Sequence, residues 1–228
     1  MSHIIHNSVE TACSQLPLDV ETFIIKVFKY FHIFTVRTER LKEFCEFVNI
    51  QYEKVLGYSS TRWLALMPAI ERIIKLFPAL KAFFLSEEKC PVTIKSFLEQ
   101  EDCELWLMFV HSQLSLFDTA IRKTEKQDAT LSESLSSYKL LQTQLTNRKE
   151  ANFVTVPVKS LETNVFQENA NGKKRFRSFV HTFYDTALSY LDMWGVHYEA
   201  YTKFCWILLK TLPEWEDIEV CIPVVEIF

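Results

Sequence analysis

Glycine is so scarce in this chain that it limits the folds open to it. Only 3 of the 228 residues are glycine and 7 are proline. Hairpins and β-sandwiches need turn residues about every 8 to 12 positions, so we do not expect an all-β fold. Hydrophobic residues make up 48% and charged residues 24% of the sequence, which is the range of globular proteins. The sequence therefore predicts a mainly α protein with a packed core.

Apolar residues recur at spacings of three and four along most of the chain, which indicates amphipathic helices. Asp19 follows Pro17 and is a suitable N-cap for the first strongly periodic helix. The segment 102–126 is apolar on most sides at first, which is typical of a central helix. Helices are expected over residues 19–34, about 38–55, 61–77, a short segment after Pro78, 91–100, 102–126, a segment that begins at Asp128 or Ser132 and extends to about 145, and from 176 onward.

The composition changes between residues 150 and 175. The run VTVPVKS combines β-branched residues with Pro157, so a strand here would be short or at a sheet edge. The polar run QENANGKK follows it. We interpret 151–175 as a linker between a helical region, 1–150, and a C-terminal segment, 176–228. The last run of that segment, EVCIPVVEIF, has the composition of a strand.

Charge and cysteine usage indicate the class of protein and its compartment. The net charge is −4 and the pI about 5.9, whereas domains built for bulk capture of nucleic acid are usually basic. The 6 cysteines include no Cys-x-x-Cys pair, as expected for thiols in a reducing compartment. We find no signal-peptide layout and no apolar run of membrane-spanning length. The sequence predicts a cytoplasmic or nuclear protein without a membrane segment.

The residue clusters that resemble reactive or metal sites all have simpler explanations. His3 and His6 are spaced to share a helix face, but a metal site needs further ligands. Acidic runs at 99–104 and 214–217 suit the first turn of a helix, where carboxylates are favoured. The scattered cysteines lie among apolar residues and suit a core. We expect no metal, no cofactor, no catalytic group and no small-molecule substrate.

One dense basic run remains as a candidate contact for nucleic acid. It comprises Lys173, Lys174, Arg175 and Arg177, with Phe176 among them. Such a run can contact phosphates or serve as a nuclear import signal, and an aromatic ring beside it can stack on bases. The alternative is a solvated helix face of no special function.

Arg62 and Trp63 follow the loop sequence GYSST and allow two interpretations. They are either an exposed pair for stacking and phosphate contact, or a core tryptophan beside a surface arginine. The stretch TRWLALMPAIERIIKLFPALKAFF, residues 61–84, resembles the middle of hAT-type DNA transposases. It is most like their vertebrate domesticated copies, such as BED-finger proteins. Residues 102–148 and 176–194 also resemble that family.

The resemblance implies a specific fold and a role for the tryptophan. In the family, an RNase H-like core holds three metal-binding acids, and a large helical domain is inserted between the second and third. The Arg-Trp pair begins this insertion, and its tryptophan handles a flipped base, a role that would fall to Trp63 beside Arg62. His3 would match the histidine of a preceding Cys-x-x-His motif. The expected fold is the helical insertion domain with a remnant of the RNase H-like core.

Departures from the family pattern shape the expected function. The first two acids would lie before Met1 and the third beyond Phe228, and no BED finger is present. Two-metal phosphoryl transfer needs carboxylates that converge on one site, so we expect no enzyme activity. The leading hypothesis is a nuclear, non-catalytic module that binds a protein or, weakly, DNA. The alternatives are an inactive transposase or nuclease part that needs missing segments, and a fragment with no retained role.

Overall fold

The chain is mainly helical, as the sequence predicts. The computed structural model describes residues 1–57, 66–167, 169–199, 201 and 215–219, and no strand occurs among them. The helices of these residues are α1 (Ser2–Cys13), α2 (Val20–His32), α3 (Thr35–Phe47), α4 (Met67–Ser86), α5 (Val92–Leu98), α6 (Cys103–Thr124), α7 (Leu131–Glu150), α8 (Val156–Phe166), α9 (Ala170–Glu199) and α10 (Trp215–Glu219).

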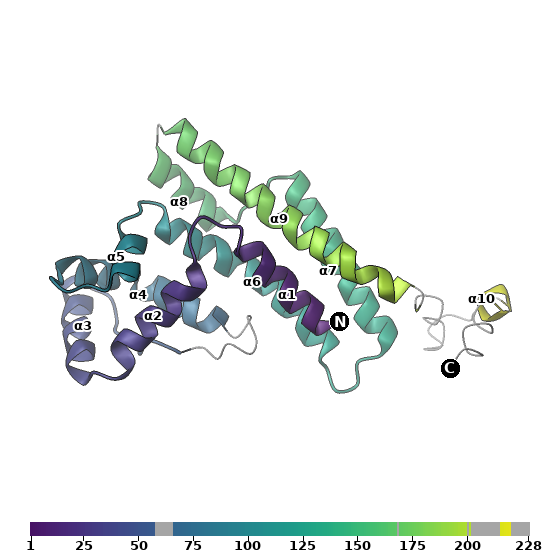
Figure 1. Ribbon diagram of the computed structural model, residues 1–228, viewed down its shortest axis with the longest axis horizontal. Helices are drawn as coiled ribbons and strands as arrows, with labels where there is room; N and C mark the ends of the chain where they lie inside the picture. The colour runs from purple at the N-terminus through teal and green to yellow at the C-terminus, as the bar shows by residue number, and fades with distance from the viewer. Residues whose placement is uncertain (58–65, 168, 200, 202–214, 220–228) are drawn as a thin grey trace.

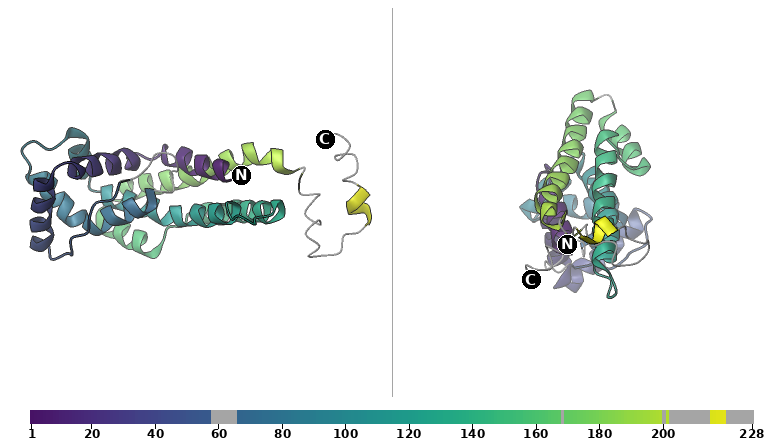
Figure 2. Two further views of the ribbon diagram at one scale, coloured as in Figure 1. Left: turned by 90° about the horizontal axis from the view of Figure 1, so that it is seen from below. Right: turned by 90° about the vertical axis from the view of Figure 1, so that its right-hand side faces the viewer.

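Helix α6 is the central element, which confirms the prediction for 102–126. It packs against α1, α4, α7 and α8, and its Trp106 and Phe109 are fully buried. Helix α9 lies along α1 and α7, while α2 to α5 gather at one end of the molecule (Figure 1). In both views of Figure 2, α1 lies beside α9. One hydrophobic cluster extends from Ile5 on α1 to Leu191 on α9.

Two helix starts show how side chains satisfy the free N–H groups of a first turn. Asp19 caps α2 as predicted, because its Oδ1 accepts a hydrogen bond from the Thr22 N–H at 2.9 Å. Thr130 caps α7 and forms a reciprocal capping box with Glu133. The sequence interpretation placed the start of this helix near its true position without recognising Thr130.

Two predicted helix boundaries were wrong. Helix α3 ends at Phe47 rather than near 55, because Asn49 adopts a φ of 56° and the Ile50 N–H bonds the Cys45 carbonyl at 2.9 Å. This is a left-handed cap, which asparagine tolerates. The expected restart at Pro78 does not occur, since α4 continues through it. A proline inside a helix costs about 3 kcal/mol, and burial of apolar side chains on both sides of Pro78 offsets it.

The segment expected to be a linker is largely helical. Residues 151–175 contain α8 and the first turns of α9. Pro157 lies in the first turn of α8, where its missing N–H has no helical partner to lose. Val158 and Phe176 are each 1% exposed and belong to the common core. The run VTVPVKS forms no strand, because most of it belongs to α8. The strand-like C-terminal run lies outside the described residues from Val220 onward.

Candidate functional site

The basic run lies on the first turns of α9, and its four cations do not share the same surroundings. Lys173, Lys174 and Arg175 are exposed. Arg177 instead forms a bidentate ion pair with Glu162 on α8, whose side chain has no exposed surface. Its Nη1 also donates to the Asn152 carbonyl at 2.6 Å. The run therefore presents three exposed cations, while the fourth joins α9 to α8 and to the preceding turn.

The three exposed cations lie at an electrostatically unfavourable position. The N-terminus of a helix carries a partial positive charge, so cations in its first turns are destabilising. Helix α9 has 30 residues, and its Gly172 N–H donates to Asn169 Oδ1 at 2.9 Å. Within the described part of the chain, none of the three cations forms an ion pair. This arrangement leaves positive charge available to an external anion.

A cavity of about 300 Å³ lies beside the basic run. Its aromatic lining comes from Trp106, Phe176 and Phe179, and the guanidinium of Arg175 lies over the Phe179 ring at 5.8 Å. The cavity also contains the carboxylate of Asp102, which accepts a hydrogen bond from Trp106 Nε1 at 2.9 Å. Because both signs of charge line it, the cavity does not have the character of an anion pocket.

The predicted pair Arg62 and Trp63 lies outside the described residues. Residues earlier in the chain, including Tyr52 and Gly57, border a cavity of about 550 Å³. Phe28, Phe31 and Tyr52 supply its aromatic surface. The cavity shares no described lining residue with the one beside the basic run.

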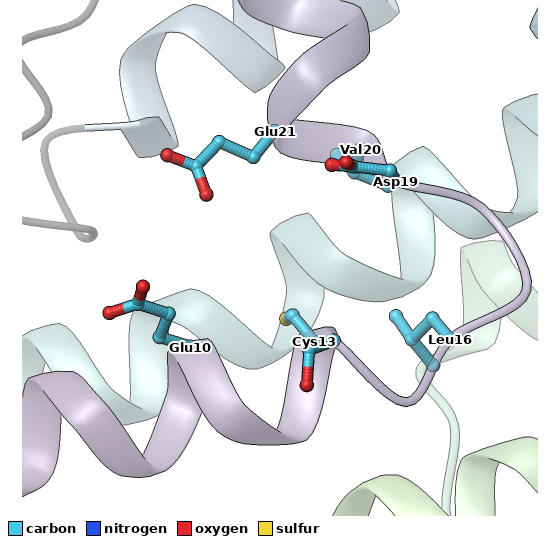
Figure 3. A pocket seen from close by; sticks show the side chains of 7 residues that line it. Glu10, Cys13, Leu16, Asp19, Val20 and Glu21 are labelled. Carbon is cyan, nitrogen blue, oxygen red and sulfur yellow. The ribbon is translucent and has the colours of Figure 1, made fainter.

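An acidic pocket of about 250 Å³ lies between α1 and α2. Figure 3 shows Glu10 and Glu21 on opposite sides of it, with Cys13 and Asp19 nearer the connecting turn. Asp19 is used as a helix cap. Burial, aided by the charge of Glu21, raises the pKa of the Cys13 thiol well above its usual value, which makes it a poor nucleophile. Among the described residues no group of three His, Cys, Asp or Glu is placed to hold a metal ion.

The C-terminal end of α9 carries an exposed apolar surface that the sequence interpretation missed. Met193 is 59%, Trp194 43% and Val196 61% exposed. The Trp194 ring lies 6.2 Å from that of Tyr190 and 6.4 Å from that of His197, between centroids. We call the surface formed by these five residues the α9 aromatic end. Its signal in the sequence is a period-seven apolar pattern that starts at Phe176 and continues beyond Leu191.

Comparisons with known proteins add no family to this description, because the chain matches no protein-family model, no curated protein and no solved structure. Among the described residues, no helix combines the length and the apolar character of a membrane span.

Proposed function

We propose that this chain is a non-catalytic helical module that binds another protein through the α9 aromatic end. The observation that carries the proposal is that Met193, Trp194 and Val196, three exposed apolar side chains, lie within four residues at the C-terminal end of one helix. Isolated exposed apolar residues are common on protein surfaces, but a contiguous group is typical of an interaction site. Tryptophan and methionine are among the residues enriched in interfaces.

The resemblance of residues 61–84 to hAT-type transposases supplies the wider context of the proposal. We propose a transposase-derived protein whose helices correspond to the insertion domain, with a remnant of the RNase H-like core, acting in the nucleus. The mainly helical fold is compatible with this origin. If a separate chain carrying the three acids of the family restored DNA cleavage in Mg²⁺ or Mn²⁺, the non-catalytic proposal would fail in favour of a split nuclease.

Site-specific photo-crosslinking tests the proposed contact surface. A benzophenone amino acid is placed at Trp194, and in a matched control at Phe47, which is 84% exposed on α3. We expect a discrete protein adduct in cells from position 194, lost when Val196→Glu is added, and no corresponding adduct from position 47. Equal labelling from both positions, or labelling that survives Val196→Glu, would reject the surface.

Weak DNA binding is a second candidate function, supported by the three exposed cations. Lys173, Lys174 and Arg175 lie on successive positions of α9 and lack ion-pair partners within the described residues. Each phosphate neutralised in B-DNA contributes about 0.9 to the slope of log affinity against log salt. Three contacts would therefore give a slope of at most about 2.7.

Fluorescence anisotropy with duplex DNA, between about 50 and 200 mM salt, tests this second candidate. Changing all three residues to glutamine should weaken binding uniformly across DNA sequences and flatten the salt dependence. Arg177→Gln is not a suitable fourth change, because it removes the partner of buried Glu162. DNA affinity and salt slope that stay unchanged in the triple variant would reject this function.

A further inference from the structure

The cavity of about 550 Å³ bounded by α2, α3 and residues 52–57 has the features of a small-molecule site. Such sites usually occupy about 300 to 1,000 Å³ and combine an apolar lining with a few polar groups. Among its lining residues, Phe31 is 6% and Val55 5% exposed, so both belong to the core. His32 and Lys54 are exposed and lie at its rim. Sequence patterns did not predict this site, because its walls come from separate segments of the chain.

Two sets of contacts hold the non-helical wall of the cavity in place. Arg72 on α4 donates from Nη1 to the Lys54 carbonyl at 2.6 Å, and its Nη2 pairs with Glu53 at 2.6 Å. Gly57 lies so close to α2 that an added Cβ would be 2.6 Å from Phe28 Cζ. The wall is therefore ordered without a ligand. A preformed site avoids the entropic cost of ordering its walls on binding.

Aromatic rings form much of the inner surface. Phe28, Phe31 and Tyr52 line the cavity, and the Phe28 ring centroid lies 4.7 Å from that of His32 at an interplanar angle of 48°. Aromatic pairs in offset or edge-to-face arrangements are more favourable than their buried area alone predicts. A planar aromatic ligand gains these ring contacts in addition to apolar burial, whereas an aliphatic ligand gains only the burial.

The charged groups of the cavity favour an anion. The Lys42 ammonium pairs with Glu39 at 2.8 Å, and it also lies 5.4 Å from the centre of the Tyr52 ring. Lys54 forms no ion pair within the described part of the chain, so one positive charge of the lining is left without a partner. An imidazole N–H of His32 is a second donor at the rim. A carboxylate here would accept a charge-assisted hydrogen bond.

We infer that this cavity binds a small aromatic carboxylate. The aromatic part lies among Phe28, Phe31 and Tyr52, and the carboxylate lies at the rim beside Lys54. The site shares no residue with the α9 aromatic end, so the inference goes beyond the proposed function and does not depend on it. Binding makes and breaks no covalent bond, in agreement with a non-catalytic module.

Isothermal titration calorimetry on the full chain, with naphthoate and with its uncharged amide as probes, tests the inference. We expect a Kd of about 10 to 100 µM for naphthoate. The amide should bind about fivefold more weakly, because it lacks the charge that faces an exposed lysine. Lys54→Gln should remove this difference, whereas Lys26→Gln, at an exposed position of α2 outside the cavity, should preserve it. Gly57→Ala should displace Phe28 and weaken both probes equally.

Methyl NMR on a valine-labelled chain locates the bound probe. Naphthoate should shift the Val55 methyl resonances and leave those of Val180, a core residue of α9, unchanged. Absence of binding at about 1 mM naphthoate would overturn the inference. Equal affinities for the two probes in the parent, an unchanged difference in Lys54→Gln, or shifts at Val180 without shifts at Val55 would also overturn it. If Gly57→Ala does not fold, the Lys54 comparison decides alone, since that side chain is exposed.

Discussion

The two ends of the core are stabilised by different kinds of interaction. In the end formed by α2 to α5, aromatic rings pack edge to face: the Phe83 and Phe84 rings lie 5.1 Å apart at 89°, and Tyr30 and Phe44 pack against Phe83. Buried polar side chains among the described residues are Ser8, Gln113, Ser134, Ser137 and Glu162. None of them lies in α2 to α5.

On the side formed by α6 to α9, polar groups run through a similar set of rings. Gln113 on α6 has no exposed surface, and its Oε1 accepts a hydrogen bond from Arg148 Nη1 at 2.7 Å. The Tyr184 hydroxyl lies 3.0 Å from the same oxygen and 2.9 Å from the Phe153 carbonyl. The pair of Glu162 and Arg177 extends these contacts to α8.

This contrast indicates where the structure tolerates change. Ring packing has broad geometric preferences, so the α2 to α5 end can adjust to a different apolar side chain. Buried hydrogen bonds are directional, and losing one partner leaves the other unsatisfied. The polar contacts therefore fix how α8, α9 and the turn between α7 and α8 fit together. They also determine which cations of the basic run remain exposed.

The largest expected effect follows from Arg177→Ala. This change leaves the fully buried carboxylate of Glu162 without its partner, and breaking a buried ion pair costs about 3 to 5 kcal/mol. Urea denaturation should show this loss, while Lys174→Ala, an exposed neighbour, should change stability by about 0.5 kcal/mol or less. The double change Glu162→Gln with Arg177→Met should recover much of the loss. An Arg177→Ala protein as stable as the parent would contradict the contrast.

An intermediate effect is expected for Tyr184→Phe, which keeps the ring and removes the hydroxyl. The Phe153 carbonyl loses this contact, and such losses cost about 1 to 3 kcal/mol. Burial raises the pKa of Tyr184 from 10.0 to about 12. An unfolded tyrosine ionises first, so its stabilising contribution is complete below pH 10 and is lost between pH 10 and about 12.

Urea melts at pH 8 and above pH 10 measure both parts of this prediction. The parent should lose stability over the alkaline interval more steeply than Tyr184→Phe. Tyr190→Phe is a useful control, because that tyrosine is only half-buried and its hydroxyl bonds Asn7 on α1 rather than Gln113 or the Phe153 carbonyl. Parallel pH profiles for parent and Tyr184→Phe would show that this hydroxyl is not held in the core.

The smallest effect is expected for Phe83→Leu in the α2 to α5 end. The residue is fully buried, and its ring contacts neighbouring aromatic rings and the Arg40 guanidinium, which lies 5.6 Å from the ring centroid. A change between apolar residues of similar size usually costs less than about 1.5 kcal/mol. If urea melts showed a loss of unfolding free energy as large as that of Arg177→Ala, this end of the core would tolerate substitution no better than the polar side.

Local sequence patterns predicted much of the helical framework. The spacing of apolar residues identified the central position of α6 and most of the buried residues of α7. Asp19 was recognised as a cap because an aspartate bonds the N–H groups of its own helix. These features depend on residues a few positions apart, so they can be inferred without knowing what lies across the core. The exposure of Lys173, Lys174 and Arg175 agrees with a charged, solvated helix face.

Other features depended on contacts between distant segments. The sequence alone gave no reason for α4 to continue through Pro78, because the apolar burial that offsets the proline comes from other helices. Arg177 could not be distinguished from the cations beside it, since its partner Glu162 lies on another helix. The α9 aromatic end follows the same heptad pattern as the buried part of that helix. Only the tertiary structure decided which part is covered, because the pattern fixes the face of a helix and the neighbouring helices determine how far that face is buried.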